Sequence, residues 1–121
     1  MLNELQAQIY LHLNTLGYPV YDAVPEESTY PYIVIGDDIA NNWGTKSFPA
    51  WNVLVTIHVW SSYDGWQEAK AIMEAIEEKL CINKFVLPNH TIAVLLPESM
   101  QVLRDPSGLR HGVLRLRVKI I

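Results

Sequence analysis

The chain has 121 residues, half of them hydrophobic, and carries a formal net charge of −4. This composition excludes an intrinsically disordered chain, and no apolar run approaches the ~20 residues of a membrane-spanning helix. The opening Met-Leu-Asn-Glu lacks the basic segment of a secretory signal and Cys81 has no partner for a disulfide, so we expect one cytoplasmic domain over residues 1–121.

The first predicted element is an amphipathic helix that ends before Gly17. Its apolar residues recur at intervals of three and four: Leu2, Leu5, Ile9, Leu13 and Leu16. Residues 20–25 follow as an extended segment, and residues 32–35 form a short buried strand after Pro31.

Residues 37–50 are polar and lack a periodic pattern, so we predict a long loop. The loop contains Trp43 and Phe48, which disordered linkers rarely contain. Residues 51–61 then alternate between apolar and mixed positions, which predicts a strand. Eleven residues at ~3.3 Å each make this strand about 36 Å long.

A second helix is predicted after the Asp64-Gly65 turn, with Asp64 as its N-cap. Its buried stripe contains Trp66, Ala69, Met73, Ile76 and Leu80. Residues 85–87 and 91–96 are predicted as two short strands, and residues 100–104 pair with the last strand through the turn at 105–108. The order of helix, two strands, helix and further strands predicts an α+β fold, with two main helices on a mostly antiparallel sheet.

The last strand, residues 112–121, has an apolar face and a cationic face. Arg115, Arg117 and Lys119 form a cationic ladder on the second face. Such a ladder requires water, an acidic neighbour or nucleic acid. The acidic net charge disfavours nucleic acid, since nucleic-acid-binding domains are usually basic. Acids within the fold or on a neighbouring molecule are the preferred partners, and a solvated edge is the simpler alternative.

Charge is unevenly distributed along the chain. Residues 1–45 contain six acids and no Lys or Arg, whereas residues 99–121 contain five bases and one acid. An acidic patch on one copy can therefore meet a basic patch on another, which suits self-assembly.

The sequence offers no pattern for catalysis. The four histidines are scattered, there is no His-x-x-x-His pair, and neither a Gly-x-Ser-x-Gly elbow nor a Gly-rich phosphate loop is present. His58 with Asp64 is the one candidate for a base with its orienting acid. Asp37 and Asp38 are candidates for a divalent ion, although solvated loop acids are the commoner case. We therefore expect a protein that is not an enzyme and that has no cofactor or metal.

Four segments together resemble a known family. They are Tyr-Pro-Tyr-Ile-Val-Ile-Gly at 30–36, Val-Thr-Ile-His-Val-Trp-Ser at 55–61, Gly-Trp-Gln-Glu-Ala at 65–69 and Leu-Arg-His-Gly-Val-Leu-Arg-Leu-Arg-Val at 109–118. Their order and spacing are similar to those of the tail completion, or tail-to-head joining, proteins of long-tailed bacteriophages and prophages.

The resemblance implies a structural subunit without catalysis or cofactor. Such a subunit is expected to assemble in the bacterial host cytoplasm and to lie in the virion tail. There, a ring of six copies caps the head-proximal end of the tail tube and docks the head connector, while the isolated subunit can be monomeric. No sequence-specific nucleic-acid binding is expected.

The residues themselves suggest two interaction surfaces. The loop is expected to project and contact the tail tube or connector, and the cationic ladder to meet acids of the adjacent subunit. The candidate interaction residues are Asp37, Asp38, Trp43, Lys46, Phe48, Arg115, Arg117 and Lys119. The alternative function is a small cytoplasmic module that binds a ligand or protein and has no role in a virion.

Overall fold

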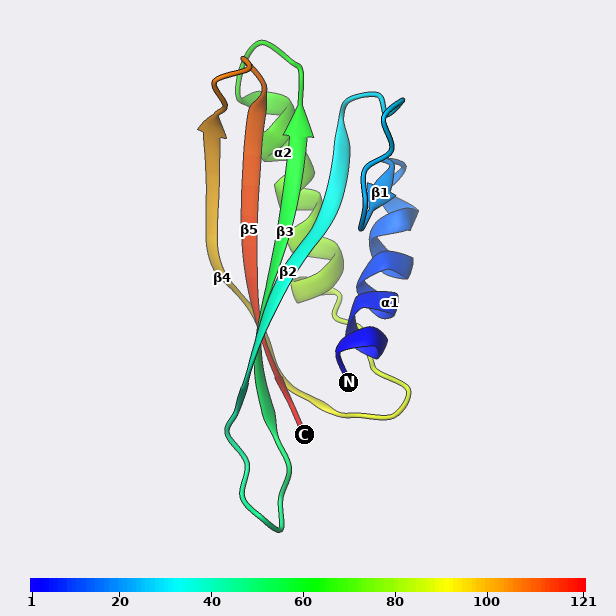
Figure 1. Ribbon diagram of the computed structural model, residues 1–121, viewed down its shortest axis with the longest axis vertical. Coiled ribbons are helices and arrows are strands. Elements are labelled where there is room, and N and C mark those ends of the chain that lie inside the picture. Colours follow the sequence, from blue (N-terminus) through cyan, green and yellow to red (C-terminus); the bar gives the residue numbers. More distant parts are fainter.

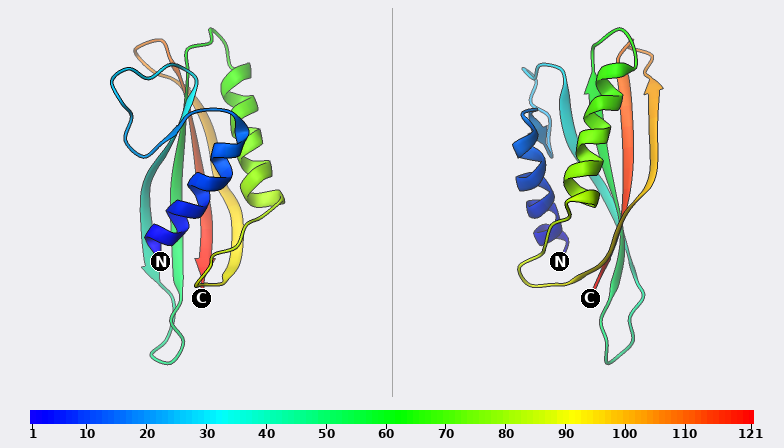
Figure 2. Two further views of the ribbon diagram at one scale, coloured as in Figure 1. Left: turned by 90° about the vertical axis from the view of Figure 1, so that its right-hand side faces the viewer. Right: turned by 180° about the vertical axis from the view of Figure 1, so that it is seen from behind.

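The computed structural model describes residues 1–121 as a five-stranded sheet with two helices on one face (Figures 1 and 2). The elements are α1 (Leu2–Leu13), β1 (Val20–Tyr21), β2 (Tyr32–Asn42), β3 (Trp51–Ser61), α2 (Gln67–Glu77), β4 (Ile92–Arg104) and β5 (Arg110–Ile120). The strand order is β1-β2-β3-β5-β4, and only the short β1 pairs in parallel with its neighbour. The predicted α+β class and its mostly antiparallel sheet are confirmed.

The core lies between the sheet and the two helices. Most residues of the predicted apolar stripes supply it, because the helical period of 3.6 and the strand period of 2 each place one face inward. The prediction is wrong for Leu2 and Trp66, which are 42% and 43% exposed at the starts of the two helices. Most of the core's largest fully buried side chains come from α1, α2, β3 and β5, among them Leu5, Ile9, Ile57, Ile72, Met73, Ile76, Leu114 and Leu116. The second face of the sheet carries no helix (Figure 2).

The predicted start of α2 is partly wrong. Trp66 is the N-cap residue, and no side chain donates or accepts a capping hydrogen bond there. Asp64 instead lies 3.5 Å from the guanidinium of Arg110 at the start of β5. The Asp64 side chain is fully exposed, so water screens this contact and it contributes little to stability.

Residues 37–42 are not loop but the second half of β2. This strand passes a bulge between Ile35 and Asp38 and then pairs with β3 as far as Asn42. The polar residues concealed this, since a strand whose side chains reach solvent does not show an apolar pattern. The partner strand, rather than the local sequence, decides the conformation here.

The segments before β5 also differ from the prediction. Residues 85–87 form no strand, although Phe85 and Leu87 are buried in the core. The strands predicted at 91–96 and 100–104 are one strand, β4, which crosses a bulge at Glu98 and pairs with β5 over its whole length. Pro97 and Glu98 interrupt the apolar pattern, and the bulge at Glu98 shifts the register, but pairing with β5 continues on both sides of it.

The loop between α2 and β4 is tied to α1 by one carboxylate. Glu4 accepts hydrogen bonds from the backbone N–H of Asn89 at 2.6 Å and from Nδ1 of His90 at 2.8 Å. The Asn89 bond is the largest cause that lowers the pKa of Glu4, and His90 adds to it against a smaller effect of burial.

We predict that Gly112→Val destabilises the fold by about 1–3 kcal/mol, since it overpacks the core. A Cβ at this position would lie 2.6 Å from Sδ of Met73 and 3.3 Å from Cβ of Val59, both buried. Urea unfolding measures the change. Adding Met73→Ala should lower the free energy of unfolding less in this variant than in the wild type. A Gly112→Val protein of unchanged stability would contradict the close packing at this position.

We predict that Glu4→Gln changes the pH dependence of stability. Because folding lowers the pKa of Glu4, its contribution is complete above the pKa of this residue in the unfolded chain and is lost as pH falls through the folded pKa. The difference in unfolding free energy between wild type and Glu4→Gln should therefore be largest near pH 7 and shrink in acid. A difference that is constant from pH 7 to pH 3 would exclude this role.

Candidate functional site

The hairpin tip, residues 43–50, joins β2 to β3 at one end of the molecule, beyond the helices and the other loops (Figure 1). It is ordered by backbone hydrogen bonds. The N–H of Trp43 donates to the carbonyl of Ala50 at 3.1 Å, and Thr45 and Phe48 bond each other at 2.8 and 3.3 Å. Gly44 is required within this narrow turn, because a Cβ there would collide with the Phe48 carbonyl.

Large aromatic side chains are exposed around the hairpin tip. Trp43 is 46% exposed and Phe48 is 54% exposed, and Trp51 at the start of β3 adds a third ring. Nζ of Lys119 lies 5.1 Å from the centre of the Trp43 ring, at cation–π distance. The fold therefore brings the predicted residues Trp43, Phe48 and Lys119 to one end, where Lys46 occupies the turn. Sequence reasoning missed Trp51 because it assigned the residue only to a strand.

Asp37 and Asp38 do not belong to the hairpin tip. They lie midway along β2, where Asp37 is exposed and Asp38 sits just beyond the bulge. Oδ1 of Asp38 is buried without a hydrogen-bond partner. Burial raises the pKa of the Asp38 carboxyl, and the neighbouring charge of Asp37 raises it further.

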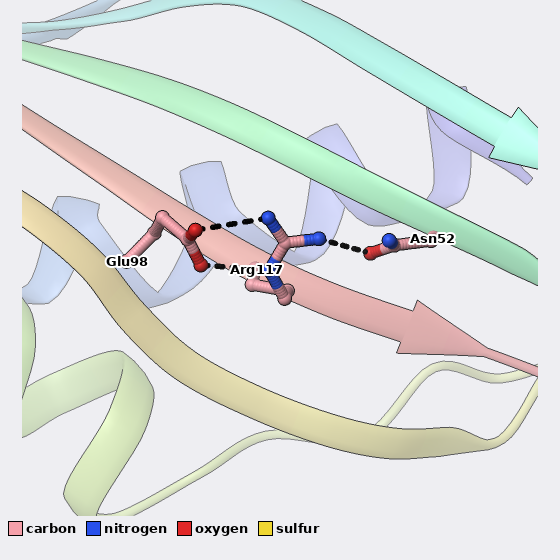
Figure 3. A network of polar contacts seen from close by, with 3 residues as sticks. All are labelled: Asn52, Glu98 and Arg117. Atoms are coloured by element: carbon pink, nitrogen blue, oxygen red, sulfur yellow. Dashed lines mark hydrogen bonds and ion pairs between the residues drawn. The ribbon is translucent and has the colours of Figure 1, made fainter.

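The cationic ladder lies on the sheet face that carries no helix, as the alternation of β5 predicted. Arg117 is already engaged within the fold (Figure 3). Its Nε and an Nη donate to the Glu98 carboxylate at 2.7 and 3.0 Å, and its other Nη donates to Oδ1 of Asn52 at 2.9 Å. The bidentate bond to Arg117 lowers the pKa of Glu98. Arg115 forms no ion pair or side-chain hydrogen bond, so the three ladder residues are not equivalent.

A histidine pair on the same face was not foreseen from the sequence. Nδ1 of His58 lies 2.8 Å from Nε2 of His111, and Trp60 stacks on His111 with ring centres 3.9 Å apart. Burial is the main cause that lowers the pKa of both imidazoles. His58 thus pairs with His111 rather than with Asp64, which contacts Arg110. Only the register of β3 with β5 could have revealed this pair.

No cluster of three or more His, Cys, Asp or Glu side chains is arranged to hold a metal ion. Cys81 is half-buried, and burial together with Glu77 raises the pKa of its thiol to about 11, so it is a poor nucleophile at neutral pH. No helix has the length and apolar character needed to span a membrane.

Comparison with known proteins identifies the chain's relatives. Residues 7–121 match the family model described as "Tail completion protein gp17". The chain is 28% identical over 112 residues to the tail completion protein gp17 of Bacillus phage SPP1, a match covering 92% of this chain and 83% of that protein. It shares its fold, at a TM-score of 0.86, with a chain of the virion of a native gene transfer agent particle. That similarity has 24% identity and covers 96% and 93% of the two chains.

The match begins within α1 and continues through α2, the whole sheet and the hairpin tip. The chain belongs to the tail completion protein gp17 family and is a structural protein of the phage tail.

Proposed function

We propose that this protein forms a ring that caps the head-proximal end of the tail tube and joins it to the head connector. Six copies are expected, to match the symmetry of the tail. The observation that carries the proposal is the ordered, projecting hairpin tip of residues 43–50, with Trp43 and Phe48 exposed. In a structural protein of the tail, such an end suits insertion into a neighbouring component.

The hairpin tip has the character of an anchor. Large aromatic side chains dominate the energetics of many interfaces because they bury much area at little entropic cost. Lys46 and Lys119 give this end a positive charge, and residues 39–52 contain no acid. The surface it contacts, on the tail tube protein or the connector, is therefore expected to be apolar with an acidic rim.

Arg115 and Lys119 are the ladder residues proposed to contact acids of the adjacent subunit. Arg117 contributes less to such a contact, because Glu98 and Asn52 already occupy its guanidinium. Assembly would take place in the host cytoplasm, with the finished ring in the virion tail. The subunit is proposed to act without catalysis, and it can remain monomeric until a tube end is available.

We predict that replacing the hairpin tip, residues 43–50, with Asn-Gly abolishes the joining of heads to tails. The two-residue turn closes the strands at the Asn42–Trp51 pair, so the fold should persist. The milder pair Trp43→Ala and Phe48→Ala should reduce joined particles by roughly 30-fold or more, as expected for hot-spot residues. In vitro joining of heads and tails, scored by electron microscopy, measures the effect.

The matched control is Val86→Ala, which removes an apolar side chain that is 81% exposed on a different loop. It should join heads and tails normally. Circular dichroism and thermal unfolding should show native structure in every variant. Normal joining by the trimmed hairpin would reject its proposed role.

We predict that Arg115→Glu together with Lys119→Glu weakens ring formation on tail tubes. The loss should be greatest at low salt, where charges are least screened. Lys79→Glu with Lys84→Glu makes the same change of net charge elsewhere on the protein and serves as control. Sedimentation of subunits with purified tubes at several salt concentrations gives the measurement. Equal binding by both double variants would show that the cationic ladder only faces solvent and contacts no neighbouring subunit.

A further inference from the structure

The two outer edges of the sheet are both incompletely paired. On one side, β1 covers β2 only at Ile33 and Val34, which leaves the part of β2 after the bulge without an outer neighbour. On the other side, β4 pairs only with β5, so its whole outer edge is open. Unpaired strand edges are templates for pairing with another chain.

Each open edge also carries a charge without a partner. Asp38 begins the regular part of β2 after the bulge, and its buried Oδ1 has no hydrogen-bond partner. Arg104 ends β4, is exposed, and forms no ion pair or side-chain hydrogen bond. Residues that pair across a sheet point to the same face, so both side chains lie on the helix-bearing side. Asp38 pairs with Val55, which is buried there. Arg104 pairs with Arg110, which in turn pairs with the buried Ser61.

We propose that the open edge of β2 in one copy pairs with the open edge of β4 in the next copy, with Asp38 opposite Arg104. The directions of the strands permit this, because β2 and β4 run antiparallel within the sheet order. One edge of each kind on every copy makes a heterologous contact, which closes into a ring under rotation. The inference rests on the ring of the proposed function and names the interface within it.

The register matches side chains of the same kind across the new edge. Besides the ion pair, Ile39 faces Leu103 and Asn41 faces Gln101. Ile39 is 56% and Leu103 is 42% exposed in the single chain, so their contact removes two large apolar side chains from water. Both pairs lie on the helix-free face, as their pairing with Leu54 and His111 shows.

The offset between copies has the size that a closed sheet requires. Asp38 pairs with Val55, Val55 with Leu116, and Leu116 with Pro97, so Asp38 and Pro97 lie at the same height in the sheet. Arg104 pairs with Arg110, which lies six residues from Leu116 along β5. In a closed sheet the strands tilt by about 35–45° from the axis of the barrel. Across the four strands that each copy contributes, this tilt offsets the next copy along the strand direction by ~13–19 Å, or about four to six residues. Shifts of four and of six residues both keep the two faces aligned, but a shift of four would place Asp38 opposite the apolar Val102.

The first test is a disulfide between copies. In a Cys81→Ser background, Ile39→Cys with Leu103→Cys should give a ladder of linked subunits after mild oxidation of protein assembled on tail tubes. These positions lie at opposite edges of one sheet, too far apart for a bond within one chain. The control pair is Ile39→Cys with Leu96→Cys, which has similar exposure and the same face but is out of register, and it should stay at background.

The second test is a charge exchange. Asp38→Lys or Arg104→Glu alone should lower the fraction of tubes that carry a ring about tenfold or more, because like charges then face each other. The double variant, Asp38→Lys with Arg104→Glu, should restore most of the lost ring formation, because opposite charges then face each other again. Rings that form in both single variants, or without the 39–103 cross-link, would overturn this inference and leave the ring standing. Wild-type protein that never forms rings on tubes would overturn the proposed function and the inference together.

Discussion

The pairing of β3 with β5 is the constraint on which the rest of the molecule depends. It joins eleven residues of each strand in one uninterrupted register, from Trp51 with Ile120 to Ser61 with Arg110. Because side chains alternate, this register places the apolar side of both strands under the helices and the cationic ladder on the open side. It also brings His58 beside His111, and it holds Asn52 where the Arg117 guanidinium can reach it.

The projecting hairpin tip follows from a mismatch of lengths. A strand of eleven residues extends about 36 Å, whereas α1 extends about 18 Å and α2, with the π-helical turn that continues it to Ile82, about 24 Å at ~1.5 Å per residue. The helices are therefore shorter than the strands, and β2 and β3 continue beyond them (Figure 1). The exposed rings of Trp43 and Phe48 are thus displayed by rigid strands, which makes this end a better contact surface than a mobile loop of the same composition.

The charges on the molecule fall into those satisfied within the fold and those left open. Glu4 fastens a loop, Glu98 holds Arg117, and Asp64 lies beside Arg110. Asp38 and Arg104, in contrast, lie on opposite edges of the sheet and have no partner. Unpaired backbone at both edges of the sheet, with an unpaired charge on each edge, is the arrangement expected of a subunit that completes itself by assembly.

Much of this protein was determined by its sequence alone. The apolar spacing of α1 and α2 and the alternation of β3 and β5 were sufficient to predict the α+β class and its core. The exposed aromatic residues at 43 and 48 were sufficient to suggest a contact surface. These features are local, since a helix or strand with one apolar face shows its period within a dozen residues.

Tertiary structure alone decided the features that depend on pairing over long distances. The extension of β2 through Asp37 and Asp38, the single strand β4, and the bond between Arg117 and Glu98 all arise from registers between strands far apart in the sequence. Polar residues in a half-solvated strand show no distinctive pattern, so only the neighbouring strand reveals that they are extended. The charge of a residue can be read in the sequence, but whether its partner lies in the same chain or in the next is decided by the fold.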